Sequence, residues 1–204
     1  MSALSSSVSM TRYQVDGKLE TPILETVAAG LNKHAIVEID DPSLEKVVGW
    51  TSFEKPYHPD FGGSSFVYGK FLVFSLRIDR KTIAPKLIKN HMVLESERRL
   101  SESGRPYLSR SEKEHIRDQV MDRLFATVPA TPHIYDIVWN YEDAALWFFS
   151  NLKAANEVLE TLFLQSFDVT LIRMIPYTAA FYASDLTDTQ KDTLLELTQT
   201  PFTG

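Results

Sequence analysis

Few histidines and acidic residues of this chain are spaced to do chemistry together. His58 and Asp60, within a loop rich in Pro and Gly, are the only pair that suggests a metal or acid–base site. The sequence has no cysteine, and it has no phosphate-binding glycine loop, zinc-protease motif or nucleophile elbow. A hydrolase or nuclease using this pair is therefore the last of three functions considered, and a solvated loop of turn-forming residues is the simpler interpretation.

Basic residues are the stronger candidates. Between Lys70 and Arg123 there are thirteen Lys and Arg against eight Asp and Glu, although the whole chain carries a net charge of −6. This asymmetry indicates a middle section that faces a polyanion. The candidate DNA-binding residues are Lys86, Lys89, Arg98, Arg99, Arg105, Arg110, Lys113 and Arg117.

Acidic residues interleave with these cations, and two interpretations stay open. A mixed-charge helical surface is typical of an ordinary solvated face, whereas cations aligned along one side can follow a phosphate backbone. The first function is thus sequence-independent binding of double-stranded DNA. The alternative is a protein–protein interaction module that keeps the fold without a DNA-binding surface. Cations gathered on one face would favour the first, and cations paired with neighbouring acids the second.

A helical hairpin at 85–128 is predicted to position the cations. Pro85 begins one helix, which ends before Gly104-Arg105-Pro106, and Ser111 with Glu114 forms the S-x-x-E capping box of a second helix reaching Phe125. Because the connection is short and its tip is polar, we expect the two helices to pack antiparallel and to project from the sheet.

The remaining elements predict an α+β protein with a mainly antiparallel sheet, because period-two apolar strands alternate with single amphipathic helices. Thr21 is expected to cap the first helix, with Pro22 as its first residue. The expected strands lie at 9–15, 36–39, 47–53, 66–78, 133–139, 144–149 and 169–175, and the other helices at 21–33, 150–163 and 187–197. The expected core contains Phe71, Val73, Phe74, Trp139, Trp147, Phe149, Leu159 and Leu171.

We interpret residues 9–177 as a single domain, with flexible ends at 1–8 and 198–204. The longest apolar runs are far shorter than a bilayer requires, so no membrane span is expected. The first ten residues lack the basic and apolar regions of a secretory signal, and a cytoplasmic protein is the default expectation. No cofactor and no metal site is predicted.

Four sequence features, in this order, resemble the RdgC family of recombination-associated bacterial proteins. The first is Gly49-Trp50 after an N-terminal strand and helix, and the second is a strand from Phe71 to Arg77 that leads into Ile83-Ala84-Pro85-Lys86-Leu87-Ile88-Lys89. The third is the charged stretch from Leu108 to Met121. The fourth is Asn151-Leu152-Lys153-Ala154-Ala155-Asn156-Glu157 followed by Leu171-Ile172. Together they cover roughly residues 13–177.

The resemblance implies a function as well as a fold. Members of this family are non-enzymatic, bind duplex DNA with little sequence preference, restrain RecA-promoted recombination and act as ring-shaped homodimers. It therefore implies a nucleoid-associated, DNA-binding homodimer without cofactor or catalysis. A positive inner surface of such a ring would explain how an acidic protein binds DNA, since its cations would be concentrated on one surface.

Overall fold

A computed structural model describes residues 5–39, 44–182 and 186–196 of the chain. It is an α+β protein whose strands form one sheet in the order β2-β4-β5-β6-β1-β7, with the short β3 paired to β4. Every pairing between these strands is antiparallel, as predicted. The strands are β1 Thr11–Asp16, β2 Lys46–Thr51, β3 Val67–Tyr68, β4 Phe71–Arg80, β5 Thr131–Asn140, β6 Ala145–Phe148 and β7 Thr170–Arg173.

Two helices cover one face of the sheet. Helices α1 (Ile23–Lys33) and α4 (Lys153–Phe167) contribute Val27, Leu159 and Phe163 to the same core as the strands. At the centre of this core lies Trp50, whose ring packs edge-on against Phe74 and stacks with Phe167 at centroid distances of 5.3 and 6.0 Å. Aromatic burial on a single side of the sheet therefore holds the two layers together.

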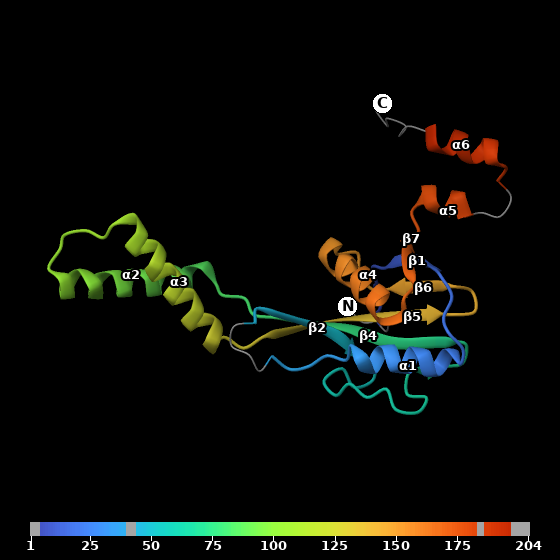
Figure 1. Cartoon of the computed structure of the whole chain (residues 1–204), viewed down its shortest axis with the longest axis horizontal. Helices are drawn as coiled ribbons and strands as arrows, with labels where there is room; N and C mark the ends of the chain where they lie inside the picture. Colours follow the sequence, from blue (N-terminus) through green and yellow to red (C-terminus); the bar gives the residue numbers. More distant parts are fainter. Residues whose placement is uncertain (1–4, 40–43, 183–185, 197–204) are drawn as a thin grey trace.

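The helical hairpin projects from the sheet, as predicted (Figure 1). It consists of α2 (Pro85–Ser103) and α3 (Arg110–Thr127), which follow β4 and precede β5. Its apolar contacts form a separate small core, so it does not depend on the main core for its own packing. The buried members of this second core are Ile83, Leu108, Ile116, Val120 and Leu124.

Half of the predicted core residues lie in the main core. Phe74, Trp139, Leu159 and Leu171 are buried there. The others are only half-buried, because β4 and β6 are apolar on both faces and the helices cover one of them. These half-buried residues are Phe71, Val73, Trp147 and Phe149.

Three expected elements differ from the structure, and the helix expected at 150–163 is displaced to α4 at Lys153–Phe167. The strand expected at 66–78 is two strands, because Gly69 adopts a left-handed φ of +62° and turns the chain between β3 and β4. The segment expected as a strand at 36–39 forms none, and only the bridge of Ala35 to Trp50 is present next to it. Pro22 is the N-cap of α1 rather than its first helical residue, with its carbonyl accepting from Thr26 N.

The C-terminal part of the chain contains two helices, α5 (Pro176–Tyr182) and α6 (Asp188–Glu196). The predicted helix at 187–197 matches α6 up to Glu196, and α5 was not expected. Residues 5–8, part of the predicted flexible end, are exposed and form neither helix nor strand. Residues 1–4 and the expected flexible end at 198–204 lie outside the described ranges.

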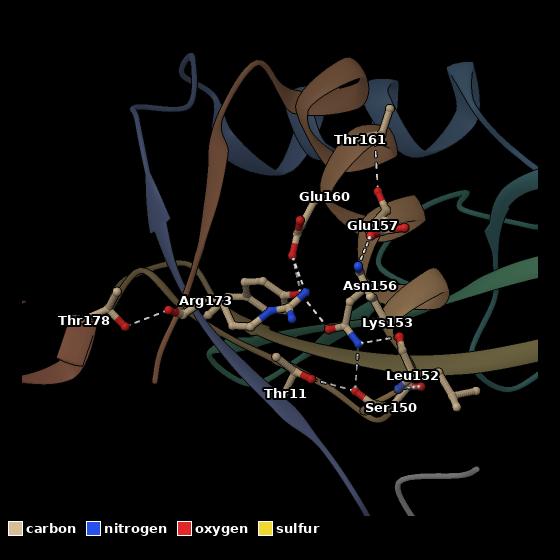
Figure 2. A network of polar contacts seen from close by, with 11 residues as sticks. Thr11, Ser150, Leu152, Lys153, Asn156, Glu157, Glu160, Thr161, Arg173 and Thr178 are labelled. Carbon is tan, nitrogen blue, oxygen red and sulfur yellow. Dashed lines mark hydrogen bonds and ion pairs between the residues drawn. The ribbon is translucent and has the colours of Figure 1, made fainter. Parts of the chain in front are cut away.

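A polar network ties α4 to both neighbouring strands of the sheet edge (Figure 2). The buried Tyr13 hydroxyl lies 2.6 Å from Asn156 Oδ1 and 2.8 Å from Glu160 Oε1, and Arg173 donates to Glu160 at 2.8 Å. Asn156 Nδ2 also donates to the carbonyls of Ser150 and Leu152, 3.3 and 2.8 Å away. Burial, reinforced by Glu160, raises the pKa of Tyr13 well above its ordinary value, so the phenol stays neutral.

Trp50 and Trp139 provide a matched test of this core. Both are at most 1% exposed, but Trp50 Nε1 donates to Ser166 Oγ at 2.8 Å, whereas Trp139 Nε1 has no acceptor among the described residues. Trp50→Phe loses a hydrogen bond that Trp139→Phe does not lose. We expect the free energy of unfolding to fall by about 1 kcal/mol more in Trp50→Phe, measured by urea titration. An equal or larger loss of unfolding free energy in Trp139→Phe would show that the Trp50 hydrogen bond to Ser166 does not stabilise the core.

Candidate nucleic-acid interface

Local capping signals define both helices of the hairpin. Helix α2 starts at Pro85, where the missing N–H is harmless, and ends at Gly104 with a left-handed φ of +64°. Helix α3 is capped by Ser109, whose hydroxyl accepts from Glu112 N while the Glu112 carboxylate accepts from Ser109 N. The capping box predicted at Ser111 and Glu114 is therefore wrong by two residues.

Polar contacts across the hairpin confirm that its helices run antiparallel. Arg105, in the loop after α2, pairs with Glu112 in the first turn of α3. Further from the tip, Arg99 donates to Gln119 Oε1 at 2.5 Å. The residue further back along α2 therefore contacts the residue further forward along α3, which is the order of contacts in an antiparallel pair.

Four of the predicted DNA-binding residues are paired with acids of the hairpin itself. Arg98 contacts Glu95 at 2.6 Å and Glu102 at 3.7 Å, and Arg99 also contacts Glu95, at 3.6 Å. Arg105 pairs with Glu112, and Arg110 contacts Glu114 at 3.1 Å. The Arg98 hydrogen bond lowers the pKa of Glu95, so this carboxylate stays charged beside its partners.

The other four predicted residues have exposed side chains without such partners. Within the described part of the chain, Lys86, Lys89, Lys113 and Arg117 make no ion pair and no side-chain hydrogen bond. Their charge is therefore available to an external anion.

Helical spacing separates the two sets around the hairpin. At about 100° per residue, Lys86 and Lys89 lie roughly 120–180° around α2 from the acid-paired side that carries Glu95 and Arg98. Lys113 and Arg117 are displaced by about 100–160° from Glu112 and Gln119 on α3 by the same spacing. In an antiparallel pair, positions displaced in the same sense around both helices share a flank, so the four unpaired cations lie toward the flank opposite the acid-paired residues, next to the buried stripe of α3. We call this side, defined by these four residues, the open flank.

Two other basic residues of the middle section are structural. Arg77 is 8% exposed and makes a two-pronged ion pair with Asp79, at 2.8 Å from Nε and 2.6 Å from Nη2. Lys81 is equally buried, and its Nζ donates to the carbonyl of Phe125, in the last turn of α3, at 2.9 Å. Both residues hold the root of the hairpin and are not accessible to a phosphate.

The loop with His58 and Asp60 contains no assembled catalytic or metal site. Both side chains are exposed, and Asp60 Oδ1 accepts from Gly62 N at 2.9 Å, which is a turn interaction. Across residues 5–39, 44–182 and 186–196, no three His, Asp or Glu side chains are grouped to hold a metal ion.

Comparison with known proteins does not identify a family for this chain. No family model matches it, and a search of curated proteins finds no match. Of the helices in the described ranges, none is both long enough and apolar enough to cross a membrane. The hairpin and its charges therefore remain the features of this chain that bear on its function.

The ionisation of Glu112 makes the stability of the first turn of α3 depend on pH. Hydrogen bonds from Arg105 and from the Ser109 backbone and hydroxyl lower its pKa from 4.5 to about 2. A lowered pKa in the folded state adds stability above the unfolded value, and this stability is lost as pH falls through the folded value. We expect the N-terminal turn of α3 to loosen between about pH 4.5 and 2, measured by amide hydrogen exchange at 110–113.

The matched variant is Glu112→Gln, which removes the titrating group and keeps the side-chain shape. In this variant the amide hydrogens at 110–113 should exchange faster at neutral pH, and their exchange should show no transition between about pH 4.5 and 2. A Glu112 carboxyl that titrates near 4.5 in the folded protein would show that the Arg105 and Ser109 contacts do not persist in solution.

Proposed function

We propose that this protein binds double-stranded DNA without sequence preference, through the open flank of the hairpin, and that it modulates homologous recombination without catalysing a reaction. The observation that carries the proposal is the set of four exposed, unpaired cations on one flank of a projecting hairpin. Phosphate contacts from such side chains provide affinity and carry no sequence information.

The spacing of the cations suits a duplex. Contacts across the hairpin place Lys113 and Arg117 near its tip, whereas Lys86 and Lys89 lie near its root. At 1.5 Å per residue, the members of the two pairs are separated by about 16–28 Å along the hairpin axis. With their long side chains, they can contact phosphates on both sides of a major groove about 12 Å wide.

The shape of the protein reconciles DNA binding with its negative charge. The hairpin has nine Lys and Arg against seven Asp and Glu, a net charge of +2, so the rest of the chain carries −8 and the whole chain −6. A 19-residue α2 is about 28 Å long, which exceeds the screening length of about 10 Å at 0.1 M salt. Repulsion between the acidic body and DNA is therefore weakest at Lys113 and Arg117, the contacts furthest from the body.

The resemblance to the RdgC family supports the biological part of the proposal. It suggests a cytoplasmic, nucleoid-associated homodimer that restrains recombination. An interaction module is the second candidate, and the pairing of Arg98, Arg99, Arg105 and Arg110 with hairpin acids favours it. The two functions differ in a single measurable property, which is affinity for duplex DNA at low salt.

A salt-titrated binding assay on two unrelated duplex sequences tests the proposal. Each true phosphate contact adds about 0.9 to the magnitude of the slope of log K against log salt concentration. We expect a slope magnitude of about 2 to 4 for the unmodified protein. Lys113→Glu/Arg117→Glu should weaken binding to both sequences equally and reduce the slope magnitude by about 1.8.

Lys18→Glu/Lys33→Glu is the matched control. It changes the net charge by the same amount at exposed positions of the sheet domain, so its effect should be small. If the unmodified protein shows no measurable duplex binding at about 50 mM salt, where the electrostatic attraction is strong, the interaction module replaces DNA binding. Equal losses in both double variants would remove the open flank as the site.

A further inference from the structure

Strand β2 forms one edge of the sheet, and part of its backbone has no partner. Its odd-numbered residues bond to the β4 side, as when the Glu45 carbonyl accepts from Lys81 N at 2.9 Å. The N–H and C=O groups of the even-numbered residues therefore point away from β4. At Lys46 and Val48, these four groups make no hydrogen bond within the described ranges. Such a row of unpaired groups is a template for one more strand.

The next position along this edge already accepts a passing segment of backbone. Trp50 N donates to the His34 carbonyl, and the Trp50 carbonyl accepts from Ile36 N, each at 2.8 Å. The contact is an isolated bridge, in which Ala35 lies opposite Trp50. The part of β2 that precedes Trp50 is therefore the open continuation of an edge that the chain itself uses.

A cavity of about 420 Å³ borders the unpaired part of the edge. It lies between β2 and α4, and its apolar lining consists of Val48, Ala154, Val158 and Leu162. Val48 is on the helix-covered face of the sheet, because its cross-strand partner Ile78 belongs to the main core. An apolar side chain placed opposite Val48 would therefore be buried between the strand and the helix.

Lys46 gives this edge a preference for negative charge. Its side chain is exposed and makes no ion pair and no hydrogen bond with the described residues. It lies on the same face as Val48, two residues away. Glu157, the acid at the cavity, is held by Lys153 at 3.8 Å. Because an edge lysine discourages strand pairing in general, a strand that binds here must offset it with an acid.

The opposite edge of the sheet lacks this combination. It is formed by β7, which has four residues. The charged side chain of that strand, Arg173, is already neutralised by Glu160 at 2.8 Å. The unpaired cation beside an apolar cavity therefore distinguishes the β2 edge.

We propose that the free edge of β2 binds an extended peptide segment of a partner protein, with an apolar residue opposite Val48 and an acidic residue opposite Lys46. The segment runs antiparallel to β2, as neighbouring strands of this sheet do. Both positions are then hydrogen-bonded pairs, which gives four backbone hydrogen bonds. Read along the peptide, the required order is apolar, any residue, acidic. Backbone bonds supply affinity in such strand addition, and alternate side chains supply specificity.

This inference goes beyond DNA binding and does not depend on it. Lys46, Val48 and the α4 residues of the cavity belong to the sheet domain, and the hairpin contributes no residue to the site. Loss of DNA binding would therefore leave the inference intact, and a failure to bind peptide would leave the open flank intact.

Titration with a synthetic peptide, followed by backbone amide NMR without DNA, tests the inference. The probe is acetyl-Thr-Val-Thr-Glu-Thr-amide, which has the required order. We expect saturable shifts of the Lys46 and Val48 amides with a Kd below about 1 mM. A control peptide with N-methylvaline in place of valine lacks one of the four hydrogen bonds. It should bind at least about fivefold more weakly.

A charge exchange tests the position of the acid. Lys46→Glu, at an exposed side chain, should raise the Kd of the probe about three- to tenfold, because like charges then face each other. A second peptide with Lys in place of Glu should bind this variant about as tightly as the probe binds the unmodified protein. Lys18→Glu makes the same change of charge at another exposed position and is the matched control. It should leave the Kd of the probe unchanged.

Three outcomes would overturn the inference. One is the absence of saturable shifts at Lys46 and Val48 with about 5 mM probe, a concentration above any Kd that specific binding here would have. Another is equal binding of the N-methylated peptide, which would show that no strand is added. The third is failure of the second peptide to bind Lys46→Glu, which would separate the acid from Lys46.

Discussion

The pairing of β4 with β5 is the constraint on which the rest of the structure depends. Ten consecutive residue pairs run from Phe71 with Asn140 to Arg80 with Thr131, and the hairpin is the excursion between the last two partners. Because both ends of the excursion are fixed in adjacent strands, its helices must leave and return at one point. The same ladder aligns the inner side chains under α1 and α4 and the outer ones, such as Phe71 and Val73, on the opposite face of the sheet. The hairpin and both faces of the sheet therefore share one register.

The root of the hairpin combines this register with buried charge. Arg77 and Asp79 lie on the same side of β4 and satisfy each other, while Lys81 reaches the last turn of α3, whose carbonyls lack helical partners. Buried ion pairs seldom add net stability, but loss of one partner leaves an uncompensated charge. Such a root favours one orientation of the hairpin over alternatives. This orientation decides which flank faces away from the acidic body.

The sequence predicted the elements better than their environments. Alternation showed which residues share a strand face, but both faces of β4 are apolar, so it could not show that Phe71 and Val73 lie away from the helices. Two overlapping S-x-x-E patterns precede α3, and the burial of Leu108 places the helix start at the first of them. The cations of the hairpin were visible in the sequence. Their partition was visible only in part: Arg98, Arg99 and Arg110 have acidic partners three or four residues away on their own helix, whereas Arg105 and Glu112 meet only after the hairpin folds.

That partition follows side-chain chemistry. The acid-paired cations are all arginines, whose planar fork suits carboxylates, whereas three of the four on the open flank are lysines, which are compact and strongly hydrated charges. The arginines stabilise a helix pair whose own core has only five buried apolar residues within the described chain. Reversing Arg98, Arg99 and Arg105 would therefore change the hairpin as well as its charge. Only on the open flank can the charge be changed without changing the hairpin, since charge reversal of its side chains breaks no contact within the described protein.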